Sequence, residues 1–147
     1  MNPTTNDSSF QVSTDRTKLD VPMIYRFLSE SSTWAVGITL PVVERSIENS
    51  LCFGGYIDGR QIAFARVITD YATTAHLADV FVLPEYRGHG YAKQLIRVVI
   101  EHPSLQRLRR FTLNTDDAHS LYARFGFTQL QRPDITMELV LPNLYIS

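Results

Sequence analysis

One stretch decides how this chain folds, and it reads VFVLPEYRGHGYAK from Val80 to Lys93. An apolar run ends at Pro84, a short connector follows, and a helical pattern opens around two glycines. Because a helix start leaves backbone N–H groups without partners, this strand–turn–helix predicts an anion site. Gly88, Gly90 and Ala92 are small, so a phosphate can approach the backbone closely. The alternative is a helix start whose glycines only make a tight turn.

Two positive side chains flank the glycines. Arg87 adds charge at the edge of the turn, and Lys93 lies in the first helical turn, where the helix dipole disfavours a cation unless an anion is bound. Two familiar phosphate loops do not fit. The P-loop pattern Gly-x-x-x-x-Gly-Lys-Ser/Thr does not occur, and the dinucleotide fingerprint needs a third glycine where Lys93 stands. Neither phosphate loop therefore accounts for the stretch, and both the anion site and the simple tight turn stay open.

The sequence on either side predicts a mixed sheet with helices on its faces. We expect strands at residues 10–13, 51–57, 61–68, 75–83, 111–114 and 135–141. We expect helices capped by Asp20, over residues 41–47 and 88–102, and through residues 121–125, the last one capped by Asp116 or Asp117. The Asp58-Gly59 pair between apolar runs predicts an antiparallel hairpin. The strand–helix–strand unit over residues 75–114 predicts parallel pairing.

Length and composition limit the function classes. The chain has 147 residues, a formal net charge of -1 and one Cys. We expect a disordered tail over residues 1–9 and a single domain over residues 10–147. One Cys excludes an internal disulfide framework and a Cys-rich zinc site, and the four His show no metal-ligand spacing. We therefore expect no metal.

Charge and hydropathy set further expectations about partners and location. The near-neutral charge gives no general field for nucleic acid, so we expect no nucleic-acid partner. No apolar run approaches the roughly 18–20 residues that span a bilayer, and the polar N-terminus has no signal-peptide pattern. We expect no membrane association and a cytoplasmic location.

Two motifs resemble those of the GNAT superfamily of acyl-CoA N-acyltransferases. The family's pyrophosphate motif is Arg/Gln-x-x-Gly-x-Gly/Ala, and residues 87–92 match every fixed position. A second signature, Asn-x-x-Ala-x-x-Leu-Tyr-x-x-x-Gly-Phe, aligns with residues 115–127, with Thr115 where Asn is common. The resemblance covers about Leu51 to Leu141.

The resemblance implies a GNAT-type α/β fold with a mixed, mostly antiparallel central sheet flanked by helices. It implies acetyl-CoA as cosubstrate, a small-molecule or peptide amine as acceptor, and a homodimer as family habit. It also implies a bulge or splay over Val80–Val82 that frees backbone groups for the pantetheine arm. The cofactor-binding residues implied are Val80, Phe81, Val82, Arg87, Gly88, His89, Gly90, Tyr91, Ala92 and Lys93.

Two residues are predicted to be catalytic. Tyr122 occupies the family's Leu-Tyr position, and a phenol of pKa near 10 can protonate a departing thiolate of pKa near 8.5. The alternative is an aromatic that packs the helix on the sheet. Asp79 interrupts an apolar strand, which suggests either a base with a raised pKa or a structural carboxylate bonded to Arg66. His76 is a weaker base candidate, on the opposite strand face under simple alternation.

Each of the other candidate residues has a structural interpretation and a functional one. The connector Trp34–Thr39 borders a pocket or simply packs as core. Cys52 is more typical of a buried apolar residue than of an acyl carrier. Glu44 and Asp70 either bind an amine or lie in solvent. The default for Arg107, Arg109 and Arg110 is a solvated loop, the alternative a contact with a CoA phosphate.

Three other functions stay open from the sequence. One is a transferase that uses a longer acyl-CoA or a non-amine acceptor. Another is a CoA-binding regulatory module without turnover. The third is a nucleotide-binding domain, which NAD or ATP would stabilise instead of acetyl-CoA.

Overall fold

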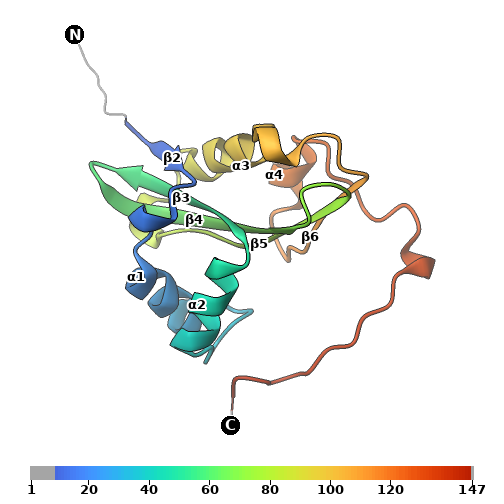
Figure 1. The fold of residues 1–147 in the computed structure, drawn as a ribbon, viewed down its shortest axis with the longest axis horizontal. Helices are drawn as coiled ribbons and strands as arrows, with labels where there is room; N and C mark the ends of the chain where they lie inside the picture. Colours follow the sequence, from blue (N-terminus) through green and yellow to red (C-terminus); the bar gives the residue numbers. More distant parts are fainter. Residues whose placement is uncertain (1–8, 147) are drawn as a thin grey trace.

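A computed structural model describes residues 9–146, so nearly all of the tail expected over residues 1–9 lies outside the described residues. Within them, five strands form one sheet in the order β2-β3-β4-β5-β6 (Figure 1). Their bounds are β2 Gln11–Ser13, β3 Leu51–Ile57, β4 Arg60–Thr69, β5 Thr74–Val82 and β6 Arg110–Leu113. All neighbours pair antiparallel except β5 and β6, which pair parallel. The mixed, mostly antiparallel sheet is confirmed.

Local chemistry explains the first elements. The β3–β4 hairpin turns at Asp58 and Gly59, whose φ angles of 50° and 78° are the left-handed values that a two-residue turn requires. Asp20 caps helix α1 (Val21–Arg26) by accepting the Met23 N–H at 3.1 Å. The chain continues through a π-helical turn, Phe27–Ser31.

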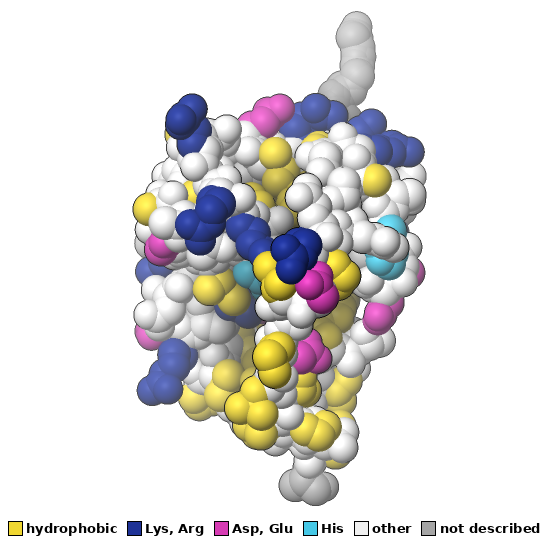
Figure 2. Space-filling view, turned by 90° about the vertical axis from the view of Figure 1, so that its right-hand side faces the viewer, with side chains coloured by type: hydrophobic (Ala, Val, Ile, Leu, Met, Phe, Trp, Pro, Cys, Tyr) yellow, Lys and Arg dark blue, Asp and Glu magenta, His cyan; other side chains and the backbone are white. Residues whose placement is uncertain are grey.

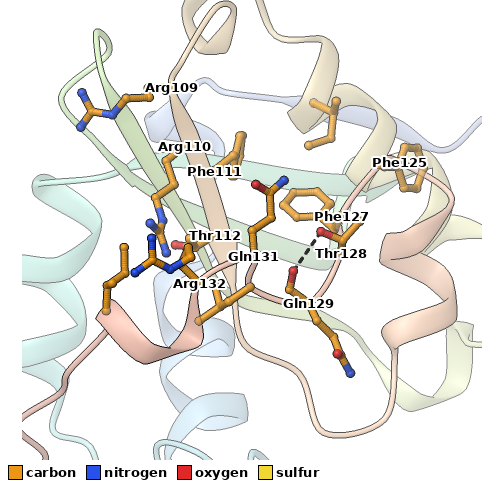
Figure 3. A pocket seen from close by; sticks show the side chains of 14 residues that line it. Arg109, Arg110, Phe111, Thr112, Phe125, Phe127, Thr128, Gln129, Gln131 and Arg132 are labelled. Atoms are coloured by element: carbon orange, nitrogen blue, oxygen red, sulfur yellow. Dashed lines mark hydrogen bonds between the residues drawn. The ribbon is translucent and has the colours of Figure 1, made fainter.

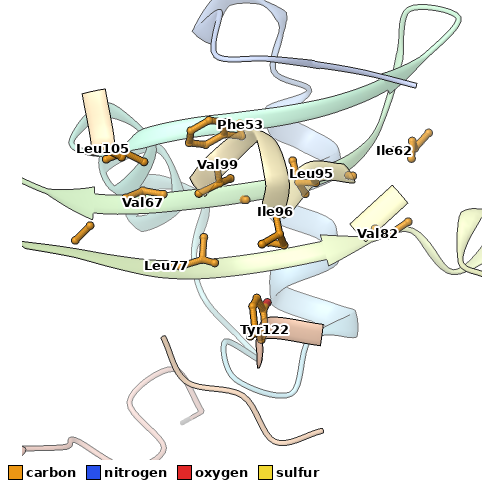
Figure 4. Close-up of a cluster of buried hydrophobic side chains, with 13 residues drawn as sticks. Phe53, Ile62, Val67, Leu77, Val82, Leu95, Ile96, Val99, Leu105 and Tyr122 are labelled. Carbon is orange, nitrogen blue, oxygen red and sulfur yellow. The ribbon is translucent and has the colours of Figure 1, made fainter. Parts of the chain in front are cut away.

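Helices cover both faces of the sheet (Figure 1). Helices α1 and α2 (Leu40–Glu48) pack on one face, over a cluster that includes Phe64 and Phe81. Helices α3 (Tyr91–Glu101) and α4 (His119–Ala123) cover the other face. There α3 and Tyr122 of α4 join a cluster with strand residues, labelled in Figure 4. Burying each large apolar side chain contributes about 1.5–3 kcal/mol, so the two clusters hold the sheet between the helices.

Two predicted helix starts were wrong in detail. Helix α3 begins at Tyr91 and not at Gly88, because Gly88 and Gly90 have φ angles of 85° and 81°, outside the helical range. Helix α4 is not capped by Asp116 or Asp117. The Ala118 N–H instead donates to Thr115 Oγ1 at 3.0 Å.

The predicted last strand, residues 135–141, was also wrong. Pro133–Ile135 forms a 3₁₀ turn, and residues 136–146 then run away from β6 as an unpaired segment (Figure 1). A strand forms only where a sheet edge receives its backbone groups, and the chain carries this segment away from the sheet. We call residues 136–146 the C-terminal arm.

Candidate active site

Strand β5 carries a bulge in its middle. Ala78 pairs with Arg66 and Phe81 with Phe64, so two residues of β5 oppose only Ala65 of β4. Asp79, inside the bulge, has a φ of 54°. The extra residue reverses which face the following side chains occupy: Leu77 belongs to the α3 cluster, whereas Phe81 belongs to the α1 cluster. The resemblance implied a bulge or splay over Val80–Val82; the bulge lies at Asp79–Val80, whereas Phe81 and Val82 pair with β4.

The bulge lies where β5 and β6 separate. Their pairing ends at Leu77 and Leu113, where β6 stops while β5 continues to Val82. A cavity of about 870 Å³ opens beyond this point. It is lined by the bulge residues, the end of β6, the start of α4 and the connector at Trp34. We call it the active-site cavity. Its size suits a small-molecule site.

The glycine turn lies next to one end of this cavity. Arg87 and Ala92, on either side of the turn, line the cavity, and Arg87 Nε donates to the Val82 carbonyl at 2.9 Å. A Cβ at Gly88 or Gly90 would meet no atom within 4 Å. Glycine is therefore favoured at both positions because of the left-handed backbone. The space in front of the N-terminus of α3 is open.

The predicted cofactor-binding residues divide into two groups. Those that line the cavity are Val80, Phe81, Val82, Arg87 and Ala92. Those in the turn and the start of α3, outside the lining, are Gly88, His89, Gly90, Tyr91 and Lys93. The ring of Tyr91 stacks on Phe10, with centroids 4.6 Å apart. The structure thus brings the strand group together around the cavity, with the glycine group adjoining it.

Tyr122 projects from α4 into the α3 core and also lines the active-site cavity (Figure 4). It is buried, and its ring packs edge-on against Phe127 with centroids 6.0 Å apart. Burial, assisted by the charge of Asp117, raises the pKa of the phenol. Tyr122 is thus a protonated donor at neutral pH.

Both carboxylate oxygens of Asp79 are engaged. Oδ1 accepts a 2.8 Å hydrogen bond from Trp34 Nε1, and Oδ2 accepts one of 2.8 Å from Arg66 Nε. Arg66 is itself held, donating to Ser50 Oγ at 3.1 Å. The base role of Asp79 stays a prediction. Its ion pair with Arg66 supports the structural alternative, because a paired carboxylate gives up those bonds when it takes a proton.

His76 lines the same cavity as Asp79. Simple alternation placed these residues on opposite faces, which was wrong because the bulge intervenes. The Nδ1 atom of His76 lies 2.8 Å from Thr112 Oγ1 on β6. Burial, with the charge of Arg66, lowers the pKa of the imidazole, so His76 is neutral at pH 7.

The remaining polar candidates lie elsewhere. Asp70 accepts a hydrogen bond from the Thr73 hydroxyl and bonds from the Thr73, Ala72 and Thr74 N–H groups in the β4–β5 turn, and together these bonds lower its pKa. Burial raises the pKa of Cys52 to about 11, as expected of an apolar residue. Glu44 and Arg107 line neither described cavity, whereas Arg109 and Arg110 line a second one, beside β6.

A metal-binding group and a membrane-spanning helix are both absent from the residues that the structure describes. No group of three or more His, Cys, Asp or Glu side chains among residues 9–146 is placed to hold a metal ion. None of the helices in this range is long and apolar enough to cross a bilayer.

Sequence reasoning found part of the site only as an alternative and missed other parts. Of the two interpretations of the Trp34–Thr39 connector, the pocket border holds for Trp34, which is 53% exposed and lines the cavity with its indole N–H bonded to Asp79. Arg66 was considered only as a partner for Asp79. Ser31, Ser32 and Thr33 also line the cavity, and nothing in their composition distinguished them from a helix end.

Comparisons with known proteins agree on a family. The model of the acetyltransferase (GNAT) family matches residues 21–127. A provisionally named acetyltransferase of Gibberella zeae is 30% identical over 137 residues, covering 78% of this chain and 76% of that protein. A crystal structure of a Xanthomonas campestris protein described as belonging to the GNAT family is 56% identical. It superposes with a TM-score of 0.93 and covers 97% of this chain and 100% of its own.

A more distant structure supports the fold alone. A Clostridium acetobutylicum protein described as a predicted acetyltransferase, crystallised with acetyl-CoA, is 15% identical with a TM-score of 0.67. It covers 90% of this chain and 95% of its own. Together with the bulged strand, the glycine turn and the family match, these findings identify the chain: it belongs to the acetyltransferase (GNAT) family.

Proposed function

We propose that this chain binds acetyl-CoA in the active-site cavity and transfers the acetyl group directly to an amine. One observation carries the proposal: the bulge of β5 and Tyr122 line a single cavity, and that cavity ends beside the glycine turn. Membership of an acetyltransferase family supports the reaction class. The Clostridium acetobutylicum protein of the same fold was crystallised with acetyl-CoA, the cosubstrate proposed for this chain.

The residues at the glycine turn fit a pyrophosphate. The left-handed backbone of Gly88 and Gly90 precedes α3, an 11-residue helix whose first N–H groups have no intrahelical acceptor. The space in front of both glycines is open. Arg87 and Lys93 supply local positive charge, so a chain with a net charge of -1 still offers an anion site.

The bulge of β5 fits the acyl end of the ligand. Bound acetyl-CoA supplies a thioester, whose carbonyl carbon the amine attacks and whose thiolate departs. The extra residue in a bulge leaves strand backbone groups without ladder partners. We infer that a backbone N–H within Val80–Val82 donates to the carbonyl oxygen as negative charge develops there.

Tyr122 donates the proton that the departing thiolate needs. Its pKa lies above the ordinary value near 10, because burial and Asp117 disfavour the phenolate. A thiol of pKa near 8.5 is the stronger acid, so this transfer is uphill for the isolated pair. The attacking nitrogen loses a second proton as the amide forms, and that proton returns through solvent to the Tyr122 oxygen, so Tyr122 ends the cycle protonated.

The amine must lose a proton before it attacks. Neutral His76 can accept it, because its lowered pKa keeps the imidazole unprotonated at pH 7. Asp79 serves this step only if it releases Trp34 or Arg66. We assign Asp79 the role of positioning Trp34 and Arg66. His76 is the competing candidate for the base, and it passes the proton on to solvent.

The cavity wall favours a cationic acceptor. Asp116 and Asp117 line the cavity together with Asp79, and Trp34 presents an exposed aromatic side chain at the same site. Carboxylates raise the local concentration of an ammonium group, and an aromatic face attracts it as well. These features support an amine in preference to an acidic or neutral acceptor.

A purified-protein experiment tests the proposal. CoA thiol release is measured with acetyl-CoA and a panel of primary amines, beside thermal shift with acetyl-CoA, a longer acyl-CoA, NAD and ATP. We expect stabilisation by acetyl-CoA and thiol release that depends on an amine. Binding without release for any acceptor favours a regulatory module. Stabilisation by NAD or ATP alone contradicts the proposal.

A further inference from the structure

One hydrogen bond joins the last two strands of the sheet beside the active-site cavity. The Nδ1 atom of His76 on β5 lies 2.8 Å from Oγ1 of Thr112 on β6. The two residues are partners in the parallel register, so the sheet itself holds their side chains together. The next pair, Leu77 and Leu113, is the last before the strands separate and the cavity opens. The bond therefore lies at the edge of the site where the proposed transfer takes place.

This bond leaves one imidazole nitrogen for the active-site cavity. His76 is partly buried and lines that cavity, whereas Thr112 does not line it. The two ring nitrogens are distinct, and the bond that one of them makes fixes the tautomer and the direction of the ring. With Nδ1 held at β6, Nε2 is the nitrogen that remains to meet an acceptor in the cavity. The state of Nε2 therefore decides whether His76 can take a proton there.

Thr112 can accept the Nδ1 hydrogen because its own hydrogen has another direction to go. A hydroxyl group has one donor hydrogen and two acceptor lone pairs. Thr112 lines the second cavity, of about 610 Å³, on the wall that also carries Arg110 (Figure 3). Solvent entering that cavity can receive the hydroxyl hydrogen, so a lone pair of Oγ1 is available to Nδ1–H. In the Nδ1–H tautomer Nε2 is an unprotonated acceptor.

The charges around the pair keep the imidazole neutral. Burial, with the positive charge of Arg66, lowers the pKa of His76. Figure 2 shows Lys and Arg side chains gathered in the upper half of the face on which β6 lies. The charged groups on the surrounding elements are Arg66 of β4, Asp79 of β5, Asp116 and Asp117 before α4, and Arg109, Arg110 and Arg132 at the second cavity. A neutral imidazole carries one hydrogen, so its position determines what His76 can do.

We propose that Thr112 is a positioning residue for the acetyl transfer: by accepting the Nδ1–H of His76, it presents Nε2 to the amine as the base. The inference rests on the proposed function and names the residue that selects the basic form of His76. The proton of the ammonium group moves to Nε2, and the Nδ1–H of the resulting imidazolium stays bonded to Thr112 Oγ1. The Nε2 proton then leaves to solvent, and His76 returns to the same tautomer.

The opposite direction of the same bond would give His76 a different role. If the Thr112 hydroxyl donated to Nδ1, Nε2 would carry the hydrogen, and His76 could only donate to a ligand in the cavity. A separation of 2.8 Å between Nδ1 and Oγ1 fits either direction. The tautomer of His76 is therefore the quantity that tests the proposal, and it is measured without any reaction.

NMR of the protein labelled with ¹⁵N in histidine reads the tautomer, because a protonated and an unprotonated ring nitrogen differ in chemical shift. His102 is an internal reference: its Nδ1 accepts the Ser104 N–H at 3.1 Å, so its neutral form carries the hydrogen on Nε2. His76→Gln assigns the His76 signals among the four histidines. At pH 7.5 we expect the Nδ1–H tautomer at His76, opposite to His102. An Nε2–H tautomer at His76 overturns the proposal.

Substitutions of Thr112 test its effect on His76. Thr112→Val keeps the β-branched shape that suits a strand and removes the hydroxyl, whereas Thr112→Ser keeps the hydroxyl. We expect the Nδ1–H tautomer to lose its dominance in Thr112→Val and to keep it in Thr112→Ser. Thr128→Val is the matched control, because Thr128 lines the same cavity and its hydroxyl donates to the Gln129 carbonyl instead. It should leave the His76 signals unchanged.

Kinetics with acetyl-CoA and an accepted amine test the role in the reaction. We expect kcat/KM for the amine to fall roughly tenfold in Thr112→Val, to recover in Thr112→Ser and to stay unchanged in Thr128→Val. The KM for acetyl-CoA should stay unchanged in all three variants. Full activity of Thr112→Val, or a loss that Thr112→Ser shares, overturns the proposal. If the wild type releases no thiol with any amine, the proposed function fails, whereas the NMR measurement still decides the tautomer.

Discussion

The indole nitrogen of Trp34 donates a 2.8 Å hydrogen bond to Oδ1 of Asp79 and so ties the connector before α2 to the bulge of β5. The other carboxylate oxygen binds Arg66, also at 2.8 Å. Asp79 thereby joins three segments of the chain at one wall of the active-site cavity. This arrangement supports the interpretation of Asp79 as a carboxylate that positions its neighbours.

Replacing Asp79 with Asn should weaken catalysis without changing its pH dependence. The amide loses the charge that holds Arg66, and we expect kcat/KM to fall roughly tenfold, equivalent to about 1.4 kcal/mol. The shape of the kcat/KM profile against pH should stay the same. Trp34→Phe removes the hydrogen bond to the other carboxylate oxygen and leaves the charge of Asp79 in place, so it is the matched control, with a loss in the same direction. If the acidic limb of the profile disappears in Asp79→Asn alone, Asp79 is the base.

Replacing Tyr122 with Phe should remove the general acid and keep the packing. The ring still fills its place against Phe127, so the melting temperature should change little. We expect kcat to fall by about 10²–10⁴-fold at saturating acetyl-CoA. Since burial raises the Tyr122 pKa, the wild-type profile should show no loss from phenol ionisation until above pH 10. Unchanged turnover in Tyr122→Phe would sink the assignment.

Gly90→Ala should weaken acetyl-CoA binding by more than the strain of an alanine in the left-handed backbone conformation explains. Gly90 and Gly59 have φ angles of 81° and 78°, and a Cβ at either would meet nothing within 4 Å. Alanine at each position should therefore cost a similar 1–2 kcal/mol or so of stability, from the left-handed backbone. Gly59 lies in the β3–β4 turn and does not line the active-site cavity, so it is the control. Calorimetric titration with acetyl-CoA should show a raised Kd only in Gly90→Ala, and equal affinities in the two variants would argue against the anion site.

Because of His76, the free energy of unfolding should decrease as the pH is lowered from neutral. Its folded-state pKa lies below the ordinary value of 6.5, so the unfolded chain binds more protons as the pH drops below that value. The free energy of unfolding should therefore be fully retained above pH 6.5 and decline between 6.5 and the lowered pKa. His76→Gln loses the Thr112 contact at every pH, so the slope is the informative quantity. Denaturation curves from pH 5 to 7.5 should show a flatter slope in the variant, and an identical slope would contradict the lowered pKa.

The sequence predicted the scaffold because local signals coincide with the fold there. Asp20 as a cap, Asp58-Gly59 as a turn and the glycine turn before α3 each depend on backbone chemistry within a few residues. The bulge was expected only from the family resemblance, since the apolar run of β5 contains no sign of an inserted residue. Its effect on side-chain direction explains why His76 and Asp79 were wrongly placed on opposite faces.

Long-range partners account for the rest of the site and the arm. The Trp34–Asp79 bond spans 45 positions, and no periodicity encodes it. The alternation of residues 135–141 correctly describes a strand-like pattern, but a pattern does not specify which sheet edge receives it. The start of α4 shows the same limit on a smaller scale: neither Asp116 nor Asp117 caps the helix, and the Ala118 N–H before it donates to Thr115 Oγ1 instead.

A crystal structure of the chain with acetyl-CoA tests the central claim most directly. The account predicts the pyrophosphate at the N–H groups of the glycine turn, the thioester carbonyl at the Val80–Val82 backbone, and the sulfur within hydrogen-bond distance of the Tyr122 hydroxyl. Acetyl-CoA bound in the second cavity, beside β6, or with its thioester remote from Tyr122, would contradict the account.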